Sequence, residues 1–359
     1  MTVQIAVCGV GLIGGSIGFA ARERCDDTEV VGFGRSQERL ERARELGAID
    51  RAAGSLEEAL AGAQVCFCCA PVGSLPAQIS DVLAVAPPDC VVTDVGSTKR
   101  GIVEPVEDER FVGGHPIAGA ETAGVEHGRA DLFRGAVWYL TPTERSSGIL
   151  LERLHRLVVA FGARPVAIDA DSHDRLLATV SHLPHVLANV LVTQAAQALT
   201  EEDAALPRVG PSFRDATRVA GANSTIWTDI YMANREAIAD EIDAVAQRMA
   251  GVAAAQGGGD PRSIEAWNEE AGACRRRLLE ADLAGGVVHE LRLTVPNRPG
   301  IVAQVALALG KAGVNIVDLA LAPAPDMRSG AMTLWIGGDE QTERARELIG
   351  DLGFPVAEA

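Results

Sequence analysis

The chain has 359 residues, of which 47% are hydrophobic and 23% charged, as in a soluble globular protein of two or three domains. Lys and Arg number 32 against 49 Asp and Glu, a net charge of −17, which argues against nucleic acid and anionic membrane as partners. We also expect no membrane span and no signal peptide, because we find neither an apolar run of roughly 18–20 residues nor a basic N-terminal segment.

The seven cysteines indicate reduced thiols. Cys66, Cys68 and Cys69 lie in one apolar run, V-C-F-C-C-A, without the CxxC spacing or the second ligand pair of a zinc site. We therefore predict buried free thiols, no metal and a cytoplasmic protein.

A buried parallel strand is predicted at residues 3–8, and it runs directly into a glycine loop. Gly9 allows a tight turn, Gly11 lets the backbone approach a pyrophosphate, and Gly14 lets helix and strand pack closely. The alternative is a glycine-rich turn that only packs a helix on a sheet. The predicted cofactor-binding residues of this loop are Gly9, Gly11, Leu12, Ile13 and Gly14.

The second predicted strand, residues 29–33, ends in Gly34-Arg35-Ser36. In a dinucleotide-binding fold this strand tip selects the cofactor, and a carboxylate there binds the ribose 2′-hydroxyl of NAD. No carboxylate is present, whereas Arg35 and Ser36 suit a 2′-phosphate, so NADP is favoured over NAD. Alternatively, Arg35 stacks on the adenine and NAD binds.

Strands and helices continue to alternate up to residue 168. Strands are predicted at 48–51, 65–70, 90–94, 136–141 and 165–168, and helices at 16–24, 36–46, 55–61, 79–85 and 149–161. This pattern predicts a doubly wound α/β domain over 1–168, with ligands at the carboxyl ends of the strands. Ala70 and Pro71 are therefore predicted to contact the cofactor, and residues 94–99 to face the same cleft.

The segment 112–124 is rich in glycine and predicts a loop that carries His115. A histidine near the nicotinamide suits a general base, because its pKa lies near ambient pH. The alternative is a loop histidine that hydrogen-bonds the backbone.

Residues 169–284 predict an all-helical domain whose apolar faces favour a homodimer. His182 and His185 share one helix face in S-H-L-P-H; a substrate contact, a core histidine and, less favoured, a metal ligand are the alternatives. Arg214, Asp215 and Arg218 in F-R-D-A-T-R predict a carboxylate-binding site, against plain surface ion pairing. Trp227 either lines that carboxylate-binding site or packs in the hydrophobic core.

Residues 287–359 show the order β-α-β-β-α with room for a last strand, which predicts a ferredoxin-like α+β domain. Its strands are expected at 287–295, 314–322, 331–337 and 355–357, and its helices at 301–312 and 342–352.

Five motifs together resemble the prephenate dehydrogenase family over the whole chain: G-L-I-G-G-S (11–16), D-V-G-S-T-K (94–99), G-H-P-I-A-G (114–119), S-H-L-P-H (181–185) and F-R-D-A-T-R (213–218). The C-terminal segment, with N-R-P-G and V-N-I-V-D-L, looks like an ACT domain, a regulatory module that binds amino acids.

The resemblance implies oxidative decarboxylation of prephenate to 4-hydroxyphenylpyruvate with NAD(P), in tyrosine biosynthesis. His115 is then the catalytic base, Ser97 orients it, and Arg218, braced by Asp215, binds a substrate carboxylate. His182 is a further pocket residue. Tyrosine is the implied effector, and the implied effector-binding residues are Asn297, Arg298, Pro299, Gly300 and Asn315.

Two positions depart from the family pattern: Gly34 stands where an acidic residue is expected, and Pro211 where relatives often have glycine. Two alternative functions also remain. An arogenate dehydrogenase takes the same ring with an amino-acid side chain. A non-catalytic nucleotide and amino-acid sensor is disfavoured by His115, Ser97 and Arg218, since a sensor has no use for a base.

Overall fold

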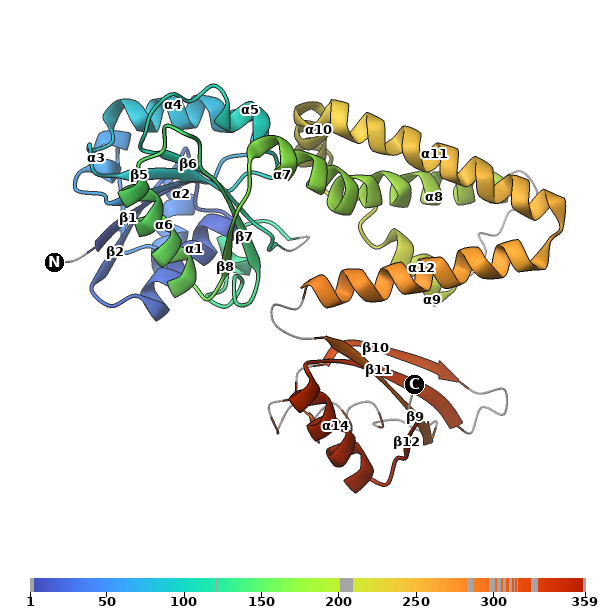
Figure 1. The fold of residues 1–359 in the computed structure, drawn as a ribbon. Helices are drawn as coiled ribbons and strands as arrows, with labels where there is room; N and C mark the ends of the chain where they lie inside the picture. The colour runs from blue at the N-terminus through green and yellow to red at the C-terminus, as the bar shows by residue number, and fades with distance from the viewer. Residues whose placement is uncertain are drawn as a thin grey trace. The chain divides into compact units, whose positions relative to one another are not determined.

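A computed structural model describes residues 3–357 except 120–121, 201–208, 283–286, 297–300, 302–304, 306–307, 310–311, 313, 315 and 324–328. The chain divides into two compact units, Met1–Gln247 and Arg248–Ala359. Figure 1 shows an α/β part, a set of long helices and a small α+β part along the chain. Each unit is described by itself below.

An eight-stranded sheet forms the centre of the first unit, in the order β3-β2-β1-β4-β5-β6-β7-β8. All its neighbouring pairs are parallel except β6 and β7. Along the chain, β2 and β3 are added on one side of β1, and β4 then pairs with the other side of β1. This reversal of direction creates the crevice in which doubly wound sheets bind ligands. The strands are β1 (Val3–Cys8), β2 (Thr28–Phe33), β3 (Arg51–Ala52), β4 (Val65–Cys68), β5 (Val91–Asp94), β6 (Phe111–Pro116), β7 (Val137–Thr141) and β8 (Arg164–Ala167).

Helical segments connect these strands: α1 (Leu12–Arg24), α2 (Gln37–Glu45), α3 (Leu56–Leu60), η1 (Val72–Ser74), α4 (Leu75–Val85), α5 (Arg100–Val103), η2 (Val125–His127) and α6 (Gly148–Ala160). Ser36 and Ser55 cap α2 and α3 as their sequences predict, since each hydroxyl accepts a hydrogen bond from the backbone N–H three residues on. The short helix α5 and the first turn of α4 were not predicted.

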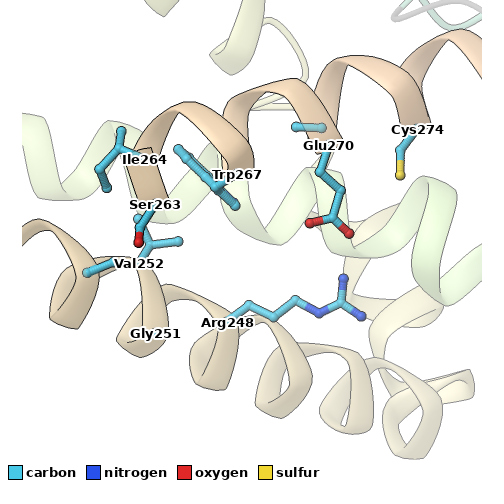
Figure 2. Close-up of a pocket in the computed structure, with 10 residues that line it drawn as sticks. Arg248, Gly251, Val252, Ser263, Ile264, Trp267, Glu270 and Cys274 are labelled. Atoms are coloured by element: carbon cyan, nitrogen blue, oxygen red, sulfur yellow. The ribbon is translucent and has the colours of Figure 1, made fainter. Parts of the chain in front are cut away.

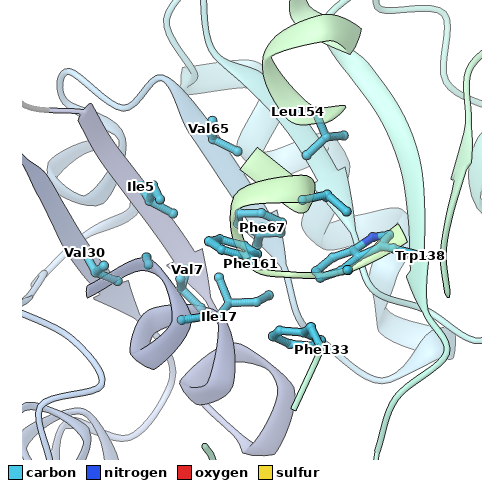
Figure 3. Close-up of a cluster of buried hydrophobic side chains, with 14 of the residues drawn as sticks. Ile5, Val7, Ile17, Val30, Val65, Phe67, Phe133, Trp138, Leu154 and Phe161 are labelled. Atoms are coloured by element: carbon cyan, nitrogen blue, oxygen red, sulfur yellow. The ribbon is translucent and has the colours of Figure 1, made fainter. Parts of the chain in front are cut away.

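Both faces of the sheet are buried. Along β1, Ile5 and Val7 belong to one apolar cluster, whereas Ala6 and Cys8 belong to another, as expected for a strand whose side chains alternate between two covered faces. Figure 3 shows the first cluster, where Phe67, Phe161 and Trp138 lie together. All seven cysteines are free; of the three predicted to be buried thiols, Cys66 and Cys68 are buried and Cys69 is partly buried. Burial contributes to raising the pKa of Cys68 to about 11.

The segment around His115 is a strand and not the predicted loop. Residues 111–116 form β6, which is buried along its whole length and pairs with β5 and β7. A Cβ atom on Gly113 would lie 2.1 Å from Thr141 Oγ1, and one on Gly114 would lie 2.6 Å from the Asp94 carbonyl oxygen. The two glycines therefore let neighbouring strands approach closely, a role that strand propensity alone does not reveal.

The helical part begins with α7 (Ala170–Leu177), a π-helical turn η3 (Ala178–His182) and α8 (Leu183–Thr200), followed by α9 (Pro211–Thr217), α10 (Ser224–Ala233) and α11 (Arg235–Gly258). The helix α11 continues through Gly257 and Gly258 and ends before Gly259, whose φ is +68°. Among the described residues, Ala170–Gln197 is the one stretch long and apolar enough to cross a membrane by length and composition, although the sequence analysis expected none. The stretch is this long because α7, the π-helical turn η3 and α8 follow one another without a break.

The second unit contains α12 (Pro261–Asp282) and a four-stranded antiparallel sheet in the order β10-β11-β9-β12. Its strands are β9 (Val288–Pro296), β10 (Ile316–Pro323), β11 (Ser329–Gly337) and β12 (Val356–Ala357), and α14 (Asp339–Asp351) precedes β12. Leu291, Leu293, Leu334, Ile336 and Ile349 are among the side chains of its separate apolar core. The sheet and its following helix agree with the predicted α+β pattern.

Candidate active site

A pocket of about 510 Å³ opens at the carboxyl ends of β1, β2 and β4. Six of the predicted cofactor-binding residues line it: Gly9, Gly11, Arg35, Ser36, Ala70 and Pro71. The other three, Leu12, Ile13 and Gly14, belong to the first turns of α1 and are not among its lining residues. The pocket thus lies at the reversal point of the sheet, where a doubly wound fold binds its ligand.

The glycine loop fits a dinucleotide. Gly9 has a φ of +109°, and a Cβ on Gly14 would lie 2.2 Å from the Gly9 carbonyl oxygen, so both positions require glycine. A Cβ on Gly11 would meet nothing within 4 Å, which leaves open space at the N-terminus of the 13-residue helix α1. No side chain caps this N-terminus, so its backbone N–H groups are available to a pyrophosphate.

Three further residues of this pocket were missed by the sequence analysis. Arg39, in the first turn of α2, adds a second cation, whereas Asp81 adds a carboxylate from α4. Gln78 accepts a hydrogen bond from Ala70 N (3.3 Å) and donates one to the Cys8 carbonyl oxygen (3.1 Å). The place of Arg39 directly after the strand tip Gly34-Arg35-Ser36, in the first turn of α2, was a signal that could have revealed the second arginine.

His115 lies near the carboxyl end of β6 with only 8% of its surface exposed. Its Nδ1 is 2.9 Å from Nε2 of His173, on α7, and His173 Nδ1 is 2.8 Å from Asp174 Oδ1. The alternative interpretation, a histidine that hydrogen-bonds the backbone, is therefore not what the structure shows at Nδ1. His173 and Asp174 were missed, although an adjacent His-Asp pair is itself a recognisable signal.

A buried ion pair lies beside this histidine. Lys99 and Asp94 are both fully buried and directly paired, and Asp94 also accepts hydrogen bonds from Gly96 N (2.8 Å) and Gly114 N (3.0 Å). The Asp94 carboxylate thus joins the end of β5 to the strand that carries His115. Ser97 lies between these residues in the chain, is partly exposed and makes no side-chain hydrogen bond with a described residue.

The surroundings of His115 favour its neutral form. Burial is the main cause that holds its pKa well below the usual 6.5, and the charges of His173, Lys99 and His182 act in the same direction. Burial likewise lowers the pKa of His182 to about 4, although Asp174 opposes this shift. Both imidazoles are therefore neutral at physiological pH, and a neutral imidazole can accept a proton.

Asn234 connects His182 to the same network. Its Nδ2 donates to the Asp174 carbonyl oxygen (2.7 Å) and to His182 Nδ1 (3.1 Å). His182 packs edge-on against Trp227, with ring centroids 6.2 Å apart, and His185 stacks on the same indole at 3.5 Å. The structure thus brings His182, His185 and Trp227, all considered from the sequence, together, and it adds Asn234 to them.

Several buried polar atoms of this cluster lack partners. His182 Nε2, His185 Nε2 and Asn234 Oδ1 are buried without a hydrogen-bond partner in the part of the chain that the structure describes. Unpaired buried polar atoms are costly and rare, so three in one cluster indicate a polar ligand.

The F-R-D-A-T-R residues lie on a different element. Arg214, Asp215 and Arg218 are exposed on or directly after α9, which packs against α8. No ion pair joins Asp215 to Arg218 among the described contacts; only a backbone hydrogen bond of 3.4 Å does. The bracing of Arg218 by Asp215 therefore stays a prediction.

The predicted effector-binding residues Asn297, Arg298, Pro299, Gly300 and Asn315 lie outside the described residues. Within the described ranges, we find no group of three or more His, Cys, Asp or Glu side chains able to hold a metal.

A separate groove of about 640 Å³ lies in the second unit, between the C-terminal half of α11 and α12. Figure 2 shows Trp267 and Ile264 on one wall and Val252 on the other. The Trp267 side chain is 47% exposed. The groove contains none of the predicted site residues and is lined largely by apolar groups.

Two family models match the chain. Residues 17–167 match the model described as prephenate dehydrogenase, nucleotide-binding domain, and residues 169–257 match prephenate dehydrogenase, dimerization domain.

Curated proteins are also similar over long ranges. Prephenate dehydrogenase of Bacillus subtilis (strain 168) is 26% identical over 356 residues, which cover 97% of this chain and 96% of the relative. Cyclohexadienyl dehydrogenase of Zymomonas mobilis is 31% identical over 250 residues, 68% of this chain and 85% of the relative.

Solved structures share the fold of most of the chain. Prephenate dehydrogenase from Aquifex aeolicus, in complex with hydroxyphenyl propionate and NAD+, matches with a TM-score of 0.73 and 27% identity over 77% of this chain and 99% of that chain. Synechocystis arogenate dehydrogenase matches with a TM-score of 0.67 and 26% identity over 77% of this chain and 100% of that chain.

Proposed function

Because the chain belongs to the prephenate dehydrogenase family, we propose that it converts prephenate to 4-hydroxyphenylpyruvate and CO2 with NAD(P), in tyrosine biosynthesis. The single observation that carries this proposal is the buried neutral imidazole of His115, at the same edge of the sheet as the dinucleotide pocket.

His115 accepts the proton of the 4-hydroxyl group in this mechanism, and Ser97 hydrogen-bonds near the hydroxyl and helps to orient His115. The nicotinamide supplies the acceptor for the hydride that leaves C4. As the C–O bond becomes a carbonyl, the ring carboxylate can leave as CO2. Its bonding electrons complete an aromatic ring and convert the carbonyl to a phenolate oxygen, which takes back the proton that His115 accepted. Aromatisation makes the reaction essentially irreversible.

The substrate is placed by the helical part of the chain. We assign the unpaired atoms His182 Nε2 and Asn234 Oδ1, beside Trp227, to a polar group of the ring substrate. Arg218 is assigned to a substrate carboxylate because its planar guanidinium matches a carboxylate in a bidentate pair, with Arg214 and Asp215 on the same helix.

Arogenate dehydrogenase is the second candidate, favoured by the likeness to the Synechocystis enzyme of that name. The two substrates differ only in the side chain, which carries a keto group in prephenate and an amino group in arogenate. Steady-state assays of both substrates, each with NAD and NADP, test the proposal. A higher kcat/KM for prephenate supports it, a higher value for arogenate selects the second candidate, and no turnover of either contradicts both.

NADP is proposed as the preferred cofactor because Arg35, Ser36 and Arg39 line the adenosine end of the pocket, where Gly34 has no carboxylate. We expect Arg35→Ala to lower kcat/KM for NADP by roughly 10–100-fold, the value of one charge-assisted phosphate contact, and to leave NAD within a few-fold. Arg42→Ala is the matched control, since Arg42 lies seven residues on, in α2, and pairs with Glu45 (3.0 Å) outside the pocket. An unchanged preference for NADP in Arg35→Ala would remove this role.

We propose that the chain has three functional segments, a Rossmann domain (1–168), a helical dimerisation domain (169–284) and an ACT domain (287–359). Val180, Val190 and Leu191 in the first unit and Trp267 and Leu278 in the second are exposed apolar side chains, and a homodimer would cover such surfaces. Light scattering combined with size-exclusion chromatography measures the mass; a monomer at assay concentration contradicts the dimer.

Tyrosine is proposed as the effector of the C-terminal segment. Its described elements follow the chain order β-β-β-α-β, and most of the helix expected at 301–312 lies outside the described residues. The Bacillus relative extends over nearly the whole chain. We expect deletion from Val287 onward to abolish inhibition by tyrosine while turnover persists. Inhibition that survives the deletion would instead place tyrosine in the active site.

A further inference from the structure

Two buried side chains behind His115 have no part in the mechanism above. His173 and Asp174 are 0% and 2% exposed and follow each other on α7, yet they connect to a strand 58 residues earlier in the chain. His115 Nδ1, His173 Nε2, His173 Nδ1 and Asp174 Oδ1 form a continuous line, with contacts of 2.9 Å and 2.8 Å between the residues.

The direction of these hydrogen bonds follows from Asp174. Its carboxylate also accepts from two backbone groups, Lys99 N (2.6 Å) and Arg100 N (2.9 Å). An ionised carboxylate can only accept, so His173 Nδ1 must carry the proton of the contact between them. A neutral His173 then presents a lone pair at Nε2, and the proton in the contact with His115 lies on His115 Nδ1.

We propose that His173 and Asp174 are positioning residues that hold His115 in the tautomer whose Nε2 accepts the substrate proton. This inference rests on the proposed role of His115 as the base. A neutral imidazole has one donor and one acceptor nitrogen, so fixing the proton on Nδ1 leaves Nε2 as the base. When Nε2 accepts a proton, the line of hydrogen bonds from His115 to the Asp174 carboxylate stabilises the imidazolium that forms.

The other groups around His115 do not replace Asp174 in this role. Lys99 follows β5, His182 comes from η3, and Tyr139 lies opposite His115 in the register of β7. None of these is a carboxylate, and Asp94, which is one, pairs directly with Lys99. Asp174 is thus the carboxylate that is connected to His115 by hydrogen bonds, through the imidazole of His173.

Asp174→Asn tests the proposal with almost no change in shape. An asparagine amide facing His173 donates, which reverses both tautomers and leaves the proton on His115 Nε2. We expect kcat to fall on the order of 10²–10⁴-fold with KM within a few-fold. Asp171→Asn on the same helix is the control; its exposed carboxylate pairs with Arg175 (2.7 Å), and its loss should leave kcat near wild type.

Variants at His173 separate the hydrogen bond from packing. In His173→Gln, the side-chain oxygen can still accept from His115 Nδ1, whereas His173→Leu fills the space without an acceptor. We expect Gln to retain at least ten times the kcat of Leu, with similar KM, and the acid limb of the pH profile to move only in Leu. Equal kcat and identical pH profiles in the two variants would mean that His173 has only a structural role and would overturn the proposal.

The tautomer itself can be measured in the wild-type enzyme with NAD+ bound, which does not depend on any variant folding. Imidazole ¹⁵N NMR, with His115 assigned by comparison with His115→Ala, should show a protonated Nδ1 and an unprotonated Nε2. A proton on Nε2 would overturn the proposal even if His115 is essential. By contrast, a wild-type enzyme without turnover of prephenate or arogenate, or a His115→Ala variant with normal turnover, would overturn the proposed function itself.

Discussion

Replacing His115 with alanine lowers kcat by about 10²–10⁴-fold and leaves KM within a few-fold of wild type, as the loss of a general base should. The buried imidazole acts on the proton of the reacting hydroxyl, whereas other groups bind the substrate. His155→Ala is the matched control, because His155 is an exposed histidine on α6. Turnover of His115→Ala close to wild type, measured under saturating substrate and cofactor, would remove His115 from the mechanism.

The pH profile of the wild-type enzyme tests the same assignment independently. Because burial holds the pKa of His115 well below 6.5, the imidazole stays neutral as pH falls through 6.5 and becomes protonated only at lower pH. We therefore expect kcat/KM to decline on the acid side with a midpoint below 6.5. A midpoint at or above 6.5 would contradict the assignment of that limb to this buried histidine.

Replacing Arg218 with alanine raises KM for the substrate by roughly 10–100-fold and changes kcat less. A charge-assisted hydrogen-bonded pair contributes about 1.5–3 kcal/mol, and each 1.4 kcal/mol corresponds to a tenfold change in binding. The side-chain carboxylate of the substrate does not change in the reaction. Its contact with Arg218 therefore stabilises the bound ground state and the transition state equally.

Two variants make the Arg218 experiment specific. Arg218→Lys keeps the charge but loses the planar fork, so its KM should lie between those of wild type and alanine. Arg235→Ala, at an exposed arginine at the start of α11, should leave KM unchanged. If Arg218→Ala also leaves KM unchanged, the substrate carboxylate is bound elsewhere, and Arg214 becomes the next residue to replace.

Local patterns predicted several of the residues that line the pocket at the carboxyl ends of β1, β2 and β4. The strand, the glycine loop and the caps at Ser36 and Ser55 depend on neighbours within a few residues, and those interactions can be read along the chain. Arg35 and Pro71 come from different strand ends, yet the rule that ligands bind at the carboxyl edge predicted their meeting.

The region around His115 was predicted less well, for a physical reason. Its glycines have low strand propensity, so the sequence predicts a loop at 112–124. In the structure, β6 is a strand because Phe111 and Val112 pair with β5 and the next four residues pair with β7. Strand pairing of this kind joins distant segments, and no local pattern records it. Bracing of Arg218 by Asp215 stays a prediction, because i, i+3 spacing allows an ion pair without requiring one.

The amino-acid sequence by itself determined that a dinucleotide pocket follows β1, that His115 and His182 are the candidate histidines, and that helices follow residue 169. Only the tertiary structure showed that α7 places His173 and Asp174 behind His115, and that Asn234 joins Asp174 to His182. The reason is that a short motif specifies which groups are present, whereas the tautomer and charge of a buried imidazole depend on residues that folding brings from 58 or more positions away.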